Sequence, residues 1–216
     1  MSEGSVLRLR TQHIFTQLAS SLHLLEGSGI PPADALLEAA ENETGMTCVP
    51  VSPTNSLLAG AHAVLDREKE MIWYSAALTP ERKSLILAHE FAHYWLHPDL
   101  SSDLCTTEET LEATVSPEAG RSAIGYNPTE RREREANLFA YELLLPTSLL
   151  RNVTQQGWSA KEIARQSGLP LSIVSLQLQY ALLVPPANEK EALLSGIETK
   201  SAKFPLDPSQ QRAAES

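Results

Sequence analysis

The sequence predicts an α+β fold in which long helices pack on a small antiparallel sheet. Two segments carry apolar residues at helical spacing behind strong helix-start signals, Thr79-Pro80 and Asn127-Pro128, and the prolines Pro98 and Pro146 end them. Three shorter runs between residues 47 and 77 are strand-like, and Met71-Ile72-Trp73-Tyr74 shows the β-branched and aromatic residues typical of strands most clearly. With 216 residues, 42% of them hydrophobic and 20% charged, the chain can build one main domain around a core.

Charge and cysteine content exclude several classes of protein. A net charge of −10 argues against broad electrostatic binding to nucleic acid, whose phosphates require a basic face. The two cysteines do not make a disulfide framework, and no apolar leader or membrane-length apolar run is present. We therefore expect a cytoplasmic protein without a membrane span.

The predicted elements follow one another in a simple order. A packing helix is expected over residues 8–26, a second helix over 33–40 and a short strand over 47–51. Strands over 57–65 and 71–77, joined by a charged turn, form a hairpin that leads directly into the helix after Thr79.

That helix contains the pattern His-Glu-x-x-His, with His89 and His93 four residues apart. Residues at this spacing lie one above the other on a helix, so both imidazoles can bind one Zn²⁺. Glu90 then lies beside the open position of the metal, where its carboxylate can take a proton from water as general base. The alternative is that both histidines are core residues satisfied by hydrogen bonds.

A third ligand is expected on the helix that follows Asn127-Pro128. The apolar face of this helix has Glu133 at its edge, whereas Glu135 lies roughly 160° away at 100° per residue and points to solvent. We therefore predict that Glu133 is the ligand. Asn137 shares its face and can orient a metal-binding histidine through the free ring N–H.

Together the two helices resemble the ImmA/IrrE family of zinc peptidases, over roughly residues 10–180. The resemblance lies in His89-Glu90-Phe91-Ala92-His93 followed by Glu133-Arg134-Glu135-Ala136-Asn137-Leu138-Phe139-Ala140 and Leu143-Leu144-Leu145-Pro146. It implies a zincin-like fold, related to gluzincins, with His89, His93 and Glu133 as ligands of Zn²⁺. The best-known members cleave a helix-turn-helix repressor, which implies roles in stress response and transcription regulation.

Two further features are predicted near the catalytic centre. An edge strand just before a zinc helix can hold an extended substrate, and Met71, Ile72, Trp73 and Tyr74 are the candidate. A plain structural strand is the alternative. Tyr126, immediately before the second helix, is a candidate stabiliser of the transition state from its placement.

The segment 98–127 is polar and acidic and is expected to be a flexible loop. It is interpreted as a solvated insertion, with a lid or a partner-docking segment as the alternative. Cys105 lies within it and could act as a fourth zinc ligand.

Three regions are predicted: a zincin-like peptidase domain over 1–150, a helix-turn-helix-like module over 151–184 and a disordered tail over 185–216. Ala164, Gly168 and Val174 fall where the helix-turn-helix motif has a small residue, a turn glycine and a buried aliphatic residue. Its second helix has no Lys or Arg, so the module is interpreted as a packing element and direct DNA binding is disfavoured.

These observations predict a zinc-dependent endopeptidase that cleaves a helix-turn-helix repressor or a similar regulatory protein. Mn²⁺ is an alternative metal in the cell. The alternative function is a non-catalytic, metal-binding regulatory module that binds a DNA-binding partner protein.

Overall fold

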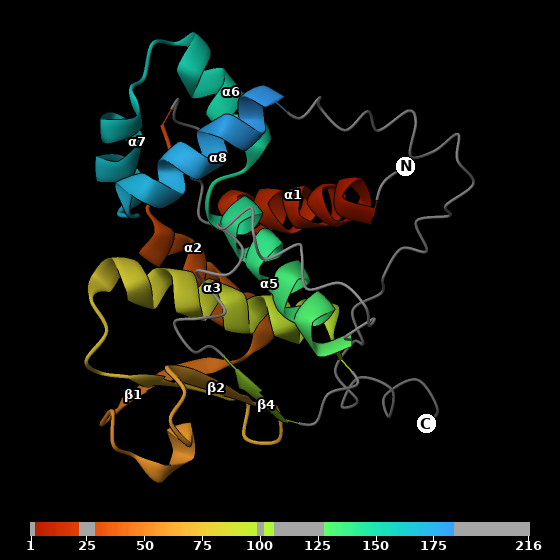
Figure 1. Ribbon diagram of the computed structural model, residues 1–216, viewed down its shortest axis with the longest axis vertical. Helices are drawn as coiled ribbons and strands as arrows, with labels where there is room; N and C mark the ends of the chain where they lie inside the picture. The colour runs from red at the N-terminus through yellow and green to blue at the C-terminus, as the bar shows by residue number, and fades with distance from the viewer. Residues whose placement is uncertain (1–2, 22–28, 99–101, 106–127, 184–216) are drawn as a thin grey trace, which may run out of the picture.

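The computed structural model describes residues 3–21, 29–98, 102–105 and 128–183, with the side chains of 3–5 and 102–105 left out. Among the residues that it describes, two helices come first in the chain, three strands and a helix follow, and a fourth strand precedes the last four helices (Figure 1). The helices are α1 (Glu3–Ser21), α2 (Ala33–Thr44), α3 (Pro80–Leu96), α5 (Pro128–Leu144), α6 (Thr147–Gln155), α7 (Ala160–Ser167) and α8 (Leu171–Leu183), with a 3-10 turn η2 (Ser56–Leu58). The strands are β1 (Thr47–Val51), β2 (Ala63–Asp66), β3 (Met71–Ser75) and β4 (Ser102–Cys105).

The α+β class is confirmed, but the sheet is mixed, whereas an antiparallel one was predicted. Its order is β1-β3-β2-β4. The hairpin of β2 and β3 and the pair of β2 and β4 are antiparallel, whereas β1 pairs in parallel with β3 and aligns Cys48 with Ile72. The parallel pair arises because β2 and η2 lie between β1 and β3 in the chain, so β3 returns beside β1 in the same direction.

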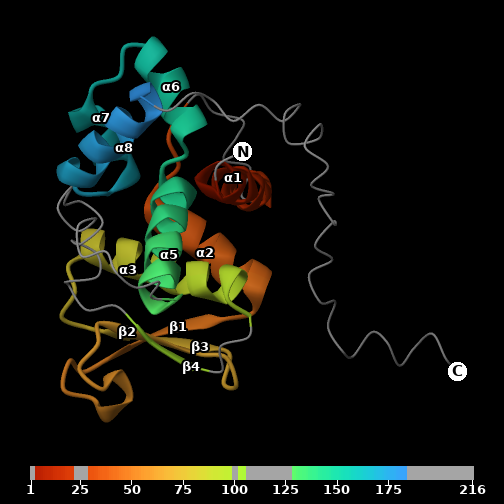
Figure 2. The same ribbon diagram turned by 45° about the vertical axis from the view of Figure 1, so that its right-hand side comes forward.

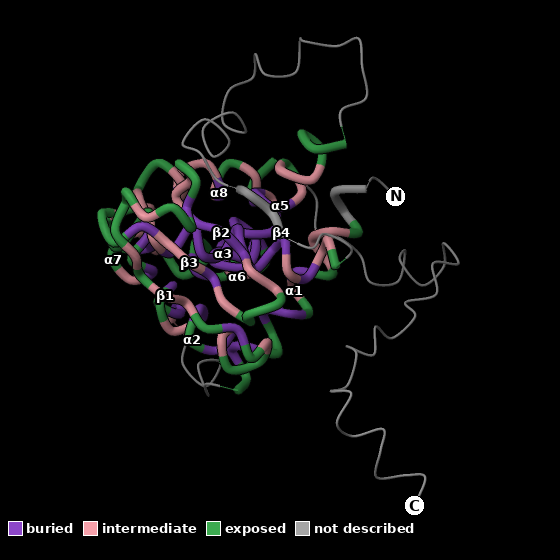
Figure 3. Tube along the Cα trace, turned by 90° about the horizontal axis from the view of Figure 1, so that it is seen from below, coloured by how far each residue is buried: buried purple, intermediate pink, exposed green. Residues whose placement is uncertain are grey.

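Helix α3 is the central element of the fold. One side of it packs on β2 and β3, α5 crosses it on the other side, and α2 lies alongside, while α1 packs on α5 and α2 (Figures 1 and 2). Every residue from Ser84 to His93 is buried, so this helix has no solvent face over its middle turns. Seen from below, the buried part of the trace is concentrated around α3, β2 and α5 (Figure 3).

The sequence signals for the two main helices predict their starts correctly. The side chain of Thr79 caps α3 by accepting a hydrogen bond from the backbone N–H of Arg82 at 3.5 Å, and Pro80 is the first helical residue. Pro128 opens α5, which ends at Leu144, just before Pro146. The start of α3 is predictable because its capping bond is local and does not depend on distant parts of the chain.

Two strand predictions need correction. The predicted strand over 57–65 is shortened to Ala63–Asp66, because Ala59 and Gly60 have positive φ angles of 48° and 89° and interrupt the extended run. Part of the segment expected to be a loop, Ser102–Cys105, is strand β4, which pairs with β2. The rest of the predicted loop, 106–127, and the predicted tail lie outside the described residues.

Helices α6, α7 and α8 form a group that packs on α5 at the end away from the sheet (Figure 1). Ser159 and Glu162 form a reciprocal capping box at the start of α7, and Gly168 ends it at φ 73°. Val174 is buried, as is Gln177, one of the two amides of α8 that could have contacted DNA. The assignment of α7 and α8 to the helix-turn-helix motif stays a prediction. No helix among the described residues is long and apolar enough to cross a bilayer.

A buried carboxylate joins this group to α5. Glu142 is 2% exposed and accepts hydrogen bonds from the backbone N–H of Thr147 at 3.0 Å and from its hydroxyl at 2.9 Å, at the first residue of α6. Burial raises the pKa of Glu142, although these two bonds and the charges of Arg8 and Arg151 oppose the shift.

The stability of the fold should therefore depend on the protonation of Glu142. Because its folded pKa is raised, the stability that this group adds is fully present below its ordinary pKa and is lost as the pH rises through the raised value. We predict that lowering the pH from about 7 toward 5 stabilises wild type relative to Glu142→Gln, whose amide keeps an acceptor for Thr147 but does not titrate. Urea unfolding of both proteins at each pH, with a chelator present, measures the difference. The prediction is contradicted if the difference in unfolding free energy between wild type and Glu142→Gln is constant with pH, or if wild type gains stability relative to the variant as the pH rises.

Candidate metal centre

The centre begins with two buried imidazoles on α3. His89 and His93 are 0% and 1% exposed, and their Nε2 atoms are 2.9 Å apart. The rings meet edge to face, with centroids 4.7 Å apart and planes at 67°. One helical turn separates the two residues, so the regular backbone of α3 is sufficient to bring both Nε2 atoms to one point.

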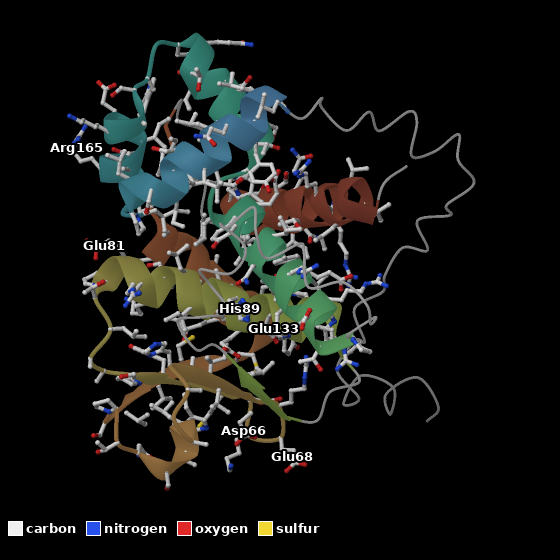
Figure 4. All side chains as sticks on the ribbon, in the orientation of Figure 1. Asp66, Glu68, Glu81, His89, Glu133 and Arg165 are labelled. Carbon is white, nitrogen blue, oxygen red and sulfur yellow. The ribbon has the colours of Figure 1, made fainter. Side chains whose placement is uncertain are left out.

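Glu133 reaches the same point from α5. Its Oε2 atom lies 3.3 Å from Nε2 of His89, and its Oε1 atom lies 3.6 Å from Nε2 of His93. Figure 4 shows His89 and Glu133 facing each other across the crossing of α3 and α5. Donor atoms of His89, His93 and Glu133 all lie within 4.8 Å of one another, so the three residues can hold one metal ion.

Asn137 holds the ring of His89 from the side away from Glu133. Its side-chain Oδ1 lies 2.7 Å from Nδ1 of His89 and is buried with it. An amide oxygen can only accept, so Nδ1 carries the proton and donates it, and the lone pair of a neutral ring is on Nε2. The atom that faces Glu133 and His93 is therefore the one available to a metal, and the hydrogen bond orients its ring.

This arrangement concentrates electron pairs at one point. In the tautomer with the proton on Nδ1, His89 presents its Nε2 lone pair to Nε2 of His93 and to the Glu133 carboxylate. Buried charge is costly unless it is paired or bound to a metal. A cation at this point would bind His89, His93 and Glu133 together. Two core histidines that only needed hydrogen bonds would not require a carboxylate at the same place.

Glu90 lies next to His89 in sequence and is fully buried, but it is outside the group of three donors. Its charge has a small effect on Cys48 of β1. Burial raises the pKa of the Cys48 thiol well above its ordinary value, the neighbouring Glu41 adds to this, and Glu90 makes a smaller contribution in the same direction.

The model of the IrrE N-terminal-like domain, a peptidase family, matches residues 54–179, which is more than half of the 216-residue chain. The chain belongs to this IrrE-like family. The match includes both helices of the centre and runs through the predicted domain boundary at residue 150 into α8. No curated protein matches the chain.

In this IrrE-like chain the predicted substrate-binding strand is not at an edge of the sheet, so that prediction is wrong. Met71, Ile72, Trp73 and Tyr74 belong to β3, which pairs with β1 on one side and with β2 on the other. Both rows of its backbone hydrogen-bonding groups are thus used within the sheet, and none is left for an extended peptide. The sequence missed this because strand order depends on contacts between distant segments.

The edges of the described sheet are β1 and β4. Strand β4 was not predicted, because Ser102-Asp103-Leu104-Cys105 is too short and too polar to show a strand pattern. Cys105, the predicted fourth ligand, lies in this strand, and its side chain is not described. Tyr126, the predicted transition-state stabiliser, lies outside the described residues.

The two glutamates of α5 offer a matched test of the centre. Glu133 faces both imidazoles, whereas the carboxylate of Glu135 accepts a hydrogen bond from Arg131 Nε at 2.8 Å on the helix surface. We predict that Glu133→Gln weakens metal binding by about tenfold or more, because a neutral amide is a poorer ligand for a dication. Glu135→Gln should bind as wild type does.

Competition with a chromophoric chelator, under conditions where both variants are folded, measures the two affinities. Equal affinities for the two variants, or a loss only in Glu135→Gln, would show that α5 contributes a different ligand.

Proposed function

We propose that this IrrE-like protein is a zinc-dependent endopeptidase, with His89, His93 and Glu133 as the ligands. The observation that carries the proposal is the convergence of two buried imidazole nitrogens and one carboxylate from two different helices. Two histidines and a glutamate with a fourth position left for water or substrate make the ligand set of a catalytic zinc site, whereas structural zinc sites use four protein ligands.

The distances suit zinc. Bonds of about 2.0–2.1 Å in a tetrahedron place neighbouring donor atoms roughly 3.3 Å apart. The distances from Glu133 to the two imidazoles are 3.3 and 3.6 Å, and the two nitrogens, at 2.9 Å, need to separate by only a few tenths of an ångström. Mn²⁺ favours oxygen ligands, so the two nitrogens make it the second choice.

Zn²⁺, when bound, is a Lewis acid that polarises a peptide carbonyl and lowers the pKa of water. Glu90 then acts as the general base that takes a proton from the attacking water and as the general acid that passes it to the leaving nitrogen. This role needs a carboxylate beside the ligands but not among them, and Glu90 is fully buried next to His89 and outside the donor group. Asn137 keeps the His89 ring oriented throughout by accepting its Nδ1 proton.

Two observations support a protein substrate of the repressor kind that the family resemblance implies. The net charge of −10 favours encounter with a basic surface, which a DNA-binding protein carries. The edge strand β4 follows α3 directly in the chain and pairs only with β2 in the described sheet, so an extended substrate segment can add to its outer side by backbone hydrogen bonds. A role as a direct DNA reader has less support, since α8 has no basic residue and its Gln177 is buried.

Glu90→Gln separates this peptidase from a non-catalytic regulatory module of the same fold. The amide is nearly isosteric but cannot take a proton, so the variant should keep its metal and its partner affinity while the rate of cleavage falls by about 10² to 10⁴. We predict that wild type fragments a co-expressed helix-turn-helix repressor and that Glu90→Gln captures it intact. The surface variant Glu135→Gln should cleave as wild type does.

Mass spectrometry of the partner after incubation with each protein loaded with Zn²⁺ or Mn²⁺ gives the answer. If the partner binds both proteins equally and stays intact with wild type during prolonged incubation, the regulatory module is the correct function.

A further inference from the structure

Arg67, at the start of the turn between β2 and β3, binds the C-terminal end of α3. Its Nη2 atom donates to the backbone carbonyl of His93 at 2.7 Å and to that of His97 at 3.0 Å. Both terminal nitrogens also contact the carbonyl of Tyr94 at 3.4 Å, and the guanidinium lies over the Tyr94 ring, 5.2 Å from its centroid. One side chain of the hairpin turn therefore contacts three residues at the C-terminal end of α3, and one of these, His93, is a proposed metal ligand.

The helix end explains why such a contact is favourable. The last four carbonyls of an α-helix have no partner within the regular helix and carry partial negative charge. The carbonyl of His93 accepts from the N–H of His97 at 3.0 Å, and Arg67 adds a charged donor to the same oxygen. A planar guanidinium can reach several carbonyls at once, which an ammonium group cannot do with the same geometry.

The position of Arg67 is itself fixed by the turn. Asp66 is the last residue of β2, pairs with Met71 in the hairpin, and accepts a hydrogen bond from the backbone N–H of Lys69 at 3.1 Å. Arg67 is half-buried between this turn and α3. The hairpin thus holds a cation at a defined place against the last turn of the helix.

We propose that Arg67 is a positioning residue for the metal centre: it fixes the last turn of α3 to the sheet and thereby holds the His93 imidazole in register with His89 and Glu133. The inference rests on the proposed metal site. His93 is the ligand closest to the C-terminal end of α3, where helices fray, and its side chain must stay within bonding distance of an ion that is also held from α5. Contacts that hold a ligand in place typically change metal affinity by about 10- to 100-fold.

Arg10 provides a matched control on the same helix turn. It extends from α1 and donates from Nη2 to the carbonyl of Trp95 at 2.8 Å. It is thus a second arginine that caps the end of α3, but it binds the carbonyl of a residue that is not a metal ligand. A general effect of capping on the helix would appear in both variants, whereas an effect on the position of His93 would appear only with Arg67.

The test measures zinc affinity by chelator competition for wild type, Arg67→Gln, Arg67→Lys and Arg10→Gln, together with the visible spectrum of each protein loaded with Co²⁺. We expect Arg67→Gln to lose about 10- to 100-fold in affinity and to change the Co²⁺ spectrum, with partial rescue in Arg67→Lys, which keeps the charge without the fork. Arg10→Gln should stay within about twofold of wild type and keep its spectrum.

Affinities and spectra of the Arg67 variants equal to those of wild type would overturn the inference, as would an equal loss in Arg10→Gln. If Arg67→Gln does not fold, Arg67→Lys decides by the same comparison with Arg10→Gln. A wild type that binds no zinc would overturn the proposed function and the inference with it, whereas zinc binding that is indifferent to Arg67 overturns the inference alone.

Discussion

The hydrogen bond from Nδ1 of His89 to Oδ1 of Asn137 is the interaction on which the rest of the centre depends. At 2.7 Å it joins residues 48 positions apart, from α3 and α5, inside their common buried interface. It fixes the tautomer of the histidine and, at the same time, the rotation of one helix against the other. The aromatic contact of Trp95 with Phe139, with centroids 5.5 Å apart, packs the same two helices further along, so that Glu133 lies opposite both imidazoles.

The sheet constrains the opposite side of α3. Strands β2 and β3 pack on that side, and Glu90, like every residue from Ser84 to His93, is buried. On the other side of the helix, the imidazoles of His89 and His93 face Glu133 of α5. In the proposed peptidase, an extended substrate would pair with β4, one of the two edges of the described sheet.

The sequence was most informative where structure is decided locally. Thr79 and Pro80 determine the start of α3, and the apolar face of α5 separates Glu133 from Glu135, because capping and periodicity act within a few residues. The sequence-based predictions failed where contacts between distant segments determine the structure. The central place of β3, the parallel pairing of β1 and the existence of β4 follow from pairing between strands, and four polar-rich residues such as 102–105 carry no pattern that predicts a partner. The contact of Arg67 with His93 is of the same kind, since 26 positions separate the two residues.

The central claim is that two imidazoles and one carboxylate hold a single zinc ion. X-ray absorption at the zinc edge of the wild-type protein, loaded to equilibrium and freed of excess metal, tests it most directly. The account predicts about one Zn²⁺ per chain, a first shell of nitrogen and oxygen only, and outer-shell scattering from two imidazole rings. Sulfur in the first shell, absence of imidazole scattering, or failure to retain stoichiometric zinc would contradict it.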